Sequence, residues 1–328
     1  MRILVALAAL VLMSCASVAD PGRNSSPTTQ SANSVWITLG TSGGPQVRPE
    51  RAQIANALQV GGAIYLFDVG NDVQRQMARA GLAERDVRAI FLSHHHLDHI
   101  ADLGPLLWTR WTFGGGPLRV IGPVGTRELV EGLIDAAGPV TLAGYPTAGP
   151  VKPTLRDLVT VEEIETDLSA PKQVYADGIL SVSAIGVAHY QTAPSVPLEH
   201  MPQAVAFRAE GGGRSIAYTG DSGPDERLAL IAQGADLLVS EVVELDAITM
   251  LLERGFGKGA ASVAEGMAVN HLTPARIGRI AANAKVAQVV LTHFVPVPEQ
   301  VGDQGIYARE IAKEYAGPVR LAQDLDRF

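Results

Sequence analysis

The chain has few of the features that would assign it to a structural class at once. Cys15 is the only cysteine among the 328 residues, so no disulfide can form within the chain. The apolar run over residues 3–13 is too short to span a bilayer as a stable helix. Acidic residues outnumber basic ones by 34 to 26, and the formal net charge of -8 argues against a polyanionic partner.

The amino terminus predicts export. The apolar run directly follows Met1 and Arg2, which is typical of the core of a signal peptide. Residues 17–19 (Ser-Val-Ala) suit ordinary signal peptidase, whereas residues 12–15 (Leu-Met-Ser-Cys) resemble a lipobox that would leave Cys15 lipidated. We therefore expect a signal peptide over residues 1–19, or a shorter lipoprotein signal, and a destination in the periplasm or on a membrane.

The rest of the chain divides into a tether and a folded part. Residues 20–34 are rich in Ser, Thr, Asn and Pro and are predicted to be a disordered tether. Residues 35–328 remain, and a hydrophobic content of 47% over the whole chain is enough for a sizeable core. We expect one large domain or two similar halves there.

A cluster of histidines and one carboxylate suggests a metal site. Residues 93–99 read Ser-His-His-His-Leu-Asp-His and follow an apolar run that is predicted to be a buried strand. Imidazole and carboxylate are the usual ligands of zinc and related ions. A histidine-rich surface turn is the alternative, but such turns do not carry an aspartate directly behind a buried strand.

The arrangement His94-x-His96-x-Asp98-His99 resembles the HxHxDH signature of the metallo-β-lactamase superfamily. The phrase over residues 39–45 is similar to the LGTxGGP of its ribonuclease Z and arylsulfatase-like members. The resemblance implies an α/β fold, the αββα four-layer sandwich, with the metals at one edge of the sheets. His95 occupies a variable position of the motif, and we assign no role to it.

Three later positions continue the series of ligands. His189 follows a predicted strand, Asp221 lies in a Gly-Asp turn, and His293 lies in a Leu-Thr-His-Phe phrase. His200 is a rival for His189, which we prefer because a strand end holds a ligand rigidly. The resemblance places the ligands of one ion at His94, His96 and His189, and those of a second ion at Asp98, His99 and His293. It makes Asp221 the carboxylate that bridges the two ions.

Further residues are candidates for support and proton transfer. Asp68 is predicted either to hold a histidine of the metal loop or to cap the next helix. Glu241 either lies beneath the site or merely ends a strand. The resemblance makes His271 of the HxT phrase a proton donor toward the leaving group, and a helix-start histidine bound to backbone is the alternative.

Two segments bear on the substrate. The aromatic residues Trp108, Trp111 and Phe113 either line a pocket or pack in the core. Residues 138–172 are interrupted by prolines and are expected to be the least regular part. Their acidic residues outnumber Lys152, Arg156 and Lys172, so we expect this insertion to be a poor clamp for tRNA.

These observations together predict an exported hydrolase of small esters, similar to arylsulfatases or phosphodiesterases. The cofactor is expected to be two zinc ions that activate a hydroxide, which Asp98 also orients, and iron is an alternative. A ribonuclease Z-type tRNA 3′ endonuclease, a β-lactamase or lactonase, and a metal-binding protein without turnover are the other candidates. We expect a small-molecule ester substrate and no nucleic acid, and leave open membrane attachment through Cys15 and a homodimer.

Overall fold

The computed structural model describes residues 33–328 apart from residues 145–147, 150–151, 166–167, 191–200 and 257–259. The predicted signal peptide, Cys15 and almost all of the tether therefore lie outside the described residues, as does His200. None of the helices that the structure describes is both long and apolar enough to cross a membrane.

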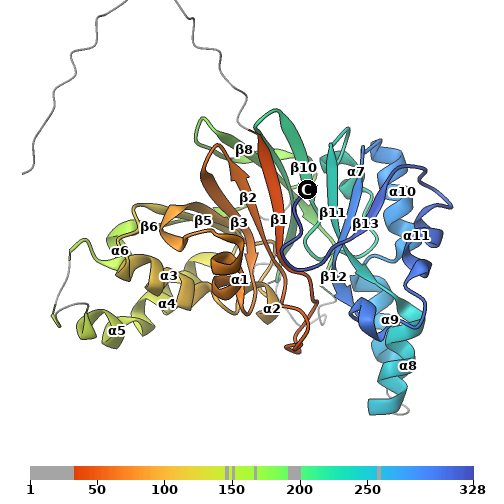
Figure 1. The fold of residues 1–328 in the computed structure, drawn as a ribbon, viewed down its shortest axis with the longest axis horizontal. Coiled ribbons are helices and arrows are strands. Elements are labelled where there is room, and N and C mark those ends of the chain that lie inside the picture. The colour runs from red at the N-terminus through yellow and green to blue at the C-terminus, as the bar shows by residue number, and fades with distance from the viewer. Residues whose placement is uncertain (1–32, 145–147, 150–151, 166–167, 191–200, 257–259) are drawn as a thin grey trace, which may run out of the picture. The chain divides into compact units, whose positions relative to one another are not determined.

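The first sheet has six strands, and neighbours in its order follow the chain (Figure 1). Its central strands are parallel and buried along almost their whole length, as parallel strands covered on both faces usually are. The strands are β1 (Ser34–Gly40), β2 (Ala55–Val60), β3 (Ala63–Val69), β4 (Val87–Phe91), β5 (Leu118–Pro123) and β6 (Val159–Ile164).

The second sheet has seven strands in the order β13-β12-β11-β10-β9-β8-β7. Strands β10 to β13 run parallel to one another, and β7 to β9 form an antiparallel meander beside them. The strands are β7 (Lys172–Ala176), β8 (Leu180–Val187), β9 (Ala204–Gly211), β10 (Arg214–Tyr218), β11 (Leu237–Val243), β12 (Val289–Val295) and β13 (Val319–Leu321).

An aromatic core joins the two sheets. Phe67 of the first sheet stacks on Phe91 at 4.8 Å between ring centroids and meets Phe207 and Tyr218 of the second sheet edge-on. Separate apolar clusters lie on the two outer faces, beneath helices. The molecule thus has the predicted four-layer αββα arrangement.

Helices α1, α3 and α4 pack on the first sheet, and α7, α10 and α11 pack on the second (Figure 1). The described helices are α1 (Val73–Ala80), α2 (Leu97–Ile100), α3 (Leu103–Thr112), α4 (Thr126–Ala136), α5 (Gly138–Ala143), α6 (Leu155–Leu158), α7 (Arg227–Ile231), α8 (Leu245–Phe256), α9 (Ala260–Asn270), α10 (Pro274–Ala284) and α11 (Gly305–Ile311).

The segment over residues 138–172 is more regular than the sequence predicts. It contains α5, α6 and β6, and β6 extends the first sheet by pairing in parallel with β5. The prolines at 139, 146, 150, 153 and 171 all lie outside β6. A strand at the edge of a sheet is half exposed, so its sequence Val-Thr-Val-Glu-Glu-Ile lacks the apolar run that marks a central strand.

The topology brings the chemically active residues to one edge. Strands β3 and β4 of the first sheet run parallel, as do β10, β11 and β12 of the second. Strand β8 runs the same way as β10, because each is antiparallel to β9. Side chains at or just beyond the carboxyl ends of these strands therefore meet at a shared edge, the usual place for a site in an α/β fold.

Candidate metal centre

The histidine-rich loop leaves the carboxyl end of β4 and runs into the short helix α2. Its residues alternate in direction, since His96 has the extended conformation (φ -65°, ψ 147°) directly before the helix. His94 and His99 are fully buried, and Asp98 is 6% exposed. The loop therefore turns three of its ligand candidates inward, although they are polar, whereas His96 is exposed.

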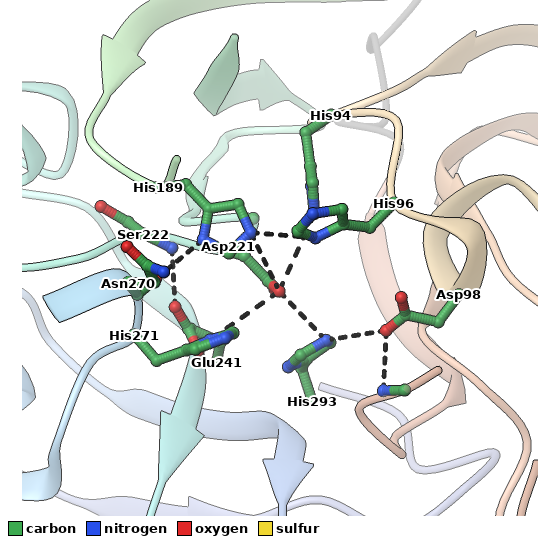
Figure 2. A network of polar contacts seen from close by, with 12 residues as sticks. His94, His96, Asp98, His189, Asp221, Ser222, Glu241, Asn270, His271 and His293 are labelled. Carbon is green, nitrogen blue, oxygen red and sulfur yellow. Dashed lines mark hydrogen bonds and ion pairs between the residues drawn. The ribbon is translucent and has the colours of Figure 1, made fainter. Parts of the chain in front are cut away.

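The structure brings all seven predicted ligands together. Candidate ligand atoms lie within 4.8 Å of one another in each of three overlapping groups: His94, His96, His189 and Asp221; Asp98, His99 and His293; and Asp221, Glu241, His271 and His293. Asp221 connects the groups, because its Oδ1 lies 3.4 Å from His99 Nε2 and its Oδ2 lies 3.3 Å from His293 Nε2. The same Oδ2 is 3.9 Å from Nε2 of both His94 and His189, and Figure 2 shows it at the centre of the cluster.

Asp68 fixes the orientation of two of these histidines. Its carboxylate accepts hydrogen bonds from Ser93 N (2.7 Å), Ser93 Oγ (2.7 Å), His99 Nδ1 (2.8 Å) and the Tyr218 hydroxyl (2.6 Å). Because Ser93 gives its one hydroxyl proton to Asp68, its Oγ can only accept from His94 Nδ1, 3.0 Å away. Both histidines thus carry a proton on Nδ1 and turn Nε2 toward the site. The alternative of a helix cap does not apply, since residue 72 precedes α1.

The imidazole nitrogens that face the site fit a divalent metal ion. Nε2 of His94 and Nε2 of His99 are buried and have no hydrogen-bond partner among the described residues. Burial lowers the pKa of His99, but the carboxylates around it, Asp221 foremost, raise it well above its ordinary value. The cluster therefore attracts positive charge and offers imidazole and carboxylate donors to it, which is the chemistry of a metal site.

His189 follows β8 of the second sheet and is held by the last residue of α9. Its Nδ1 donates to the backbone carbonyl of Asn270 at 2.8 Å, and its Nε2 lies 3.1 Å from His96 Nδ1 (Figure 2). Burial lowers the pKa of His189 to about 4, so the ring is neutral at physiological pH. The rival position, His200, lies outside the described residues.

His271 and Glu241 form a buried pair next to Asp221. His271 Nδ1 lies 2.6 Å from Glu241 Oε2 and 3.8 Å from Asp221 Oδ2, while Ser222 N donates to Glu241 Oε1 at 2.6 Å. Burial alone lowers the pKa of His271, but the Glu241 carboxylate outweighs it and raises that pKa to about 9. The ring is 12% exposed, so it retains a route to a substrate. Glu241 therefore does more than end a strand.

The aromatic segment lies apart from this cluster. Trp108 Nε1 donates to the carbonyl of Leu133 at 3.2 Å, and Trp111 Nε1 donates to that of Pro153 at 3.0 Å. Trp111 lines a cavity of about 400 Å³ between α3 and the segment of α5 and α6, and none of the seven ligands lines it. Phe113 is 64% exposed. Trp111 therefore contacts the insertion, Trp108 contacts α4, and the cavity that Trp111 lines is not a pocket over the metal centre.

Sequence reasoning missed contacts that tertiary structure creates. Tyr218 reaches Asp68 from a strand 150 residues away, and no local pattern marks it. Gly44 donates its backbone N–H to Asp98 Oδ2 at 2.7 Å. The glycine-rich phrase that includes Gly44 was the available signal, but it indicated only a family resemblance and no contact with Asp98.

Comparison with known proteins gives a consistent family. Residues 64–294 match the profile of the beta-lactamase superfamily domain. A protein named Ribonuclease Z from Mycobacterium marinum is 31% identical over 306 residues, which cover 89% of this chain and 98% of that protein. A Ribonuclease Z from Mycolicibacterium paratuberculosis is 32% identical over 304 residues, covering 89% and 97%.

Solved structures share the fold. The metallo-β-lactamase fold protein YhfI from Bacillus subtilis is 20% identical with a TM-score of 0.63, and 90% of this chain and 98% of that chain are covered. The short form of human tRNase Z is 21% identical with a TM-score of 0.61 and the same coverage. Zn²⁺-bound PqqB from Methylobacterium extorquens is 18% identical with a TM-score of 0.62, covering 90% and 99%.

The relatives correct two expectations from the sequence. The exported hydrolase of small esters, arylsulfatase-like or phosphodiesterase-like, is wrong as the main prediction, because relatives that align with 89% of the chain are named Ribonuclease Z. The expected partners, a small-molecule ester and no nucleic acid, are wrong for the same reason. The error came from treating net charge and one acidic insertion as evidence about the substrate, although neither describes the surface next to the metals.

Proposed function

From the membership of this chain in the metallo-β-lactamase superfamily, in its ribonuclease Z branch, we propose that it is a ribonuclease Z-type endonuclease that cleaves precursor tRNA. The chain is a metal-dependent hydrolase, and what carries the choice of RNA is identity of 30% to 32% to ribonucleases Z over 89% of the chain. The family profile spans residues 64–294, which include all seven predicted ligands.

The cofactor is proposed to be two zinc ions. The ligand groups support this number, because Asp221 lies between two sets of donors and can bridge them. Imidazole nitrogens and carboxylate oxygens suit zinc, and Zn²⁺-bound PqqB shares the fold, whereas iron accepts the same donors. Metal analysis of protein purified without added metal distinguishes the two.

The ions, when bound, would supply a hydroxide at neutral pH and polarise the phosphodiester under attack. The chain's own residues then have separate tasks. Asp98 and Asp221 both direct their carboxylates toward the proposed metal centre. The backbone amide of Gly44 orients the Asp98 carboxylate. His271 keeps one proton on Nδ1, facing Glu241, and can give the proton on Nε2 to the departing oxygen.

Location within the cell is a separate proposal. The leader over residues 1–19 supports export, whereas precursor tRNA is a cytoplasmic substrate, so the fate of the leader is informative. The intact mass of the protein from its native host tests the proposal directly. A chain that starts at Asp20 or at a lipidated Cys15 supports export, and a retained Met1 contradicts it.

A substrate panel tests the function. The metal-loaded protein is given a precursor tRNA with a 3′ trailer, the matching mature tRNA, an aryl phosphodiester and an aryl sulfate, each with and without chelator. The proposal predicts efficient removal of the trailer and little effect on mature tRNA. Hydrolysis of the aryl sulfate without any cleavage of RNA would overturn it.

A further inference from the structure

Three successive histidines in the metal loop create an ambiguity of register. His94, His95 and His96 all carry imidazole, and side chains of an extended segment alternate between its two sides. In one register of the loop, His94 and His96 both face the metal site. If the loop shifts by one residue, only His95 of the three faces it. Some contact outside the ligand set has to select the first arrangement.

His95 points away from the ligand cluster and toward α4. Its Nε2 lies 2.9 Å from Thr126 Oγ1, the hydroxyl of the first residue of that helix. His95 also lines a hollow with Gly125, which precedes α4, and with residues of α4 that include Leu129, and none of the seven predicted ligands lines it. The middle histidine is thus on the opposite side of the loop from its neighbours.

The direction of this hydrogen bond follows from its neighbours. Thr126 Oγ1 donates its only proton to the carbonyl of Pro123 at 2.7 Å, so it can only accept from His95. His95 Nε2 must therefore carry a proton and cannot at the same time offer a lone pair to a metal ion. The contact both anchors the loop and removes this nitrogen from the set of ligands.

The anchor itself is rigid. Thr126 is fully buried. A Cβ at Gly122 of β5 would lie 2.5 Å from the Thr126 hydroxyl oxygen, so glycine at this position makes space for the hydroxyl. Glu163 Oε1 accepts from the backbone amides of Gly125 (2.8 Å) and Arg127 (3.0 Å), which fixes the start of α4. A buried hydroxyl at a fixed helix start can determine the position of the loop.

We propose that His95 is a positioning residue, whose hydrogen bond to Thr126 sets the register of the three histidines so that His94 and His96 face the metal. This role requires the proposed metal centre but not the RNA substrate. It is specific to this chain's run of three histidines, because a non-ligating residue between His94 and His96 would leave no ambiguity.

Zinc affinity and the spectrum of the Co²⁺-substituted protein test the proposal. Thr126→Val is nearly isosteric and should weaken zinc affinity by about tenfold, the size expected when a supporting contact is lost. It should also change the visible Co²⁺ bands, because His95 is then free to compete for the ion. Thr126→Ser retains the hydroxyl and should restore both properties.

A second variant and a control complete the test. His95→Leu should weaken zinc affinity to a similar extent, whereas His95→Gln should largely preserve it. The double variant His95→Leu/Thr126→Val should bind zinc no more weakly than either single variant. Leu97→Gln, at a residue that lies between ligands but is 63% exposed, should leave zinc affinity unchanged. Circular dichroism of each metal-free variant verifies folding.

The outcomes separate this inference from the proposed function. If the wild-type protein binds no metal, the proposed function fails. If it binds zinc but Thr126→Val and His95→Leu bind equally well with unchanged Co²⁺ bands, the positioning role is wrong. The positioning role would also be wrong if the double variant lost zinc affinity by the product of the two single-variant factors, because the two residues would then act independently.

Discussion

Gly44 and Asp98 are joined by a hydrogen bond of 2.7 Å from the backbone N–H of Gly44 to the side-chain oxygen Oδ2 of Asp98. The same oxygen lies 3.2 Å from His293 Nε2, so the amide fixes a carboxylate that faces the metal centre (Figure 2). The approach requires glycine, because a Cβ at position 44 would lie 2.3 Å from Asp98 Cβ. The amino-terminal glycine phrase thus belongs to the site.

Gly44→Ala should displace Asp98, lower metal occupancy and reduce turnover by about tenfold or more, as loss of an orienting contact does. Metal content after dialysis and steady-state rates measure the effect. Gly132→Ala is the control, since a Cβ there meets nothing within 4 Å and alanine favours a helix. Full metal content and normal rates in Gly44→Ala would contradict the role of this contact.

His271→Ala should reduce turnover by about 10²- to 10⁴-fold, the usual contribution of a general acid, and leave metal content intact. The reason is that His271 touches Glu241 and Asp221 but belongs to neither proposed set of three histidine and aspartate ligands. Glu241→Gln should show a smaller loss, because the amide still accepts a hydrogen bond. Release of both metals from His271→Ala would show that the residue is a ligand.

Removal of metal should abolish hydrolysis and also destabilise the fold. The cluster buries Asp68, Asp98, Asp221 and Glu241 close together, and their repulsion is relieved by a cation. At a free metal concentration of about a thousand times Kd, binding adds about 4 kcal/mol to the free energy of unfolding. Urea unfolding with and without chelator measures the difference, and equal curves would mean that no metal stabilises the native state.

Asp177 should make stability depend on acid pH. Burial acts to raise its pKa, but hydrogen bonds from the Tyr65 hydroxyl and from the amides of Leu180 and Ile179 outweigh it, so the pKa falls from 3.8 to about 2. Because the folded pKa is depressed, the stabilisation is complete above pH 3.8 and is lost as the pH falls toward 2.

The matched variant for this prediction is Asp177→Asn, which keeps the shape and loses the charge. Wild type should have the higher free energy of unfolding at pH 6, and the difference should narrow as the pH falls below 4. Urea unfolding at several pH values measures it. A difference that stays constant over this range would assign the stabilisation to packing and not to the ionised carboxylate.

The sequence predicts those parts of the fold and site that depend on neighbouring residues. The helix over Val73–Ala80 ends at Gly81, whose left-handed conformation is typical of a helix end, and the hairpin of β9 and β10 lies where glycines separate two apolar runs. The metal loop is recognisable because its ligands follow one buried strand within seven residues. Asp221 and His293 were predicted from the resemblance of their short phrases and from their order along the chain.

The remaining features depend on distant contacts that no local pattern records. The hydrogen bond from Tyr218 to Asp68 and the anchor of His95 on Thr126 exist only after the sheets and α4 are assembled. Strand β6 was missed because the prolines around it suggested an irregular segment and because an edge strand lacks the apolar run of a central strand. The substrate was mispredicted because charge counts do not show which surface faces the metals.

The most direct measurement of the central claim is single-turnover cleavage of a precursor tRNA by the zinc-loaded protein, with both new ends of the RNA mapped. The account predicts one cut at the 3′ end of the tRNA body, abolished by chelator and strongly slowed in His271→Ala. No cleavage by a protein shown to hold its metals, or cuts scattered along the RNA that His271→Ala leaves unchanged, would contradict it.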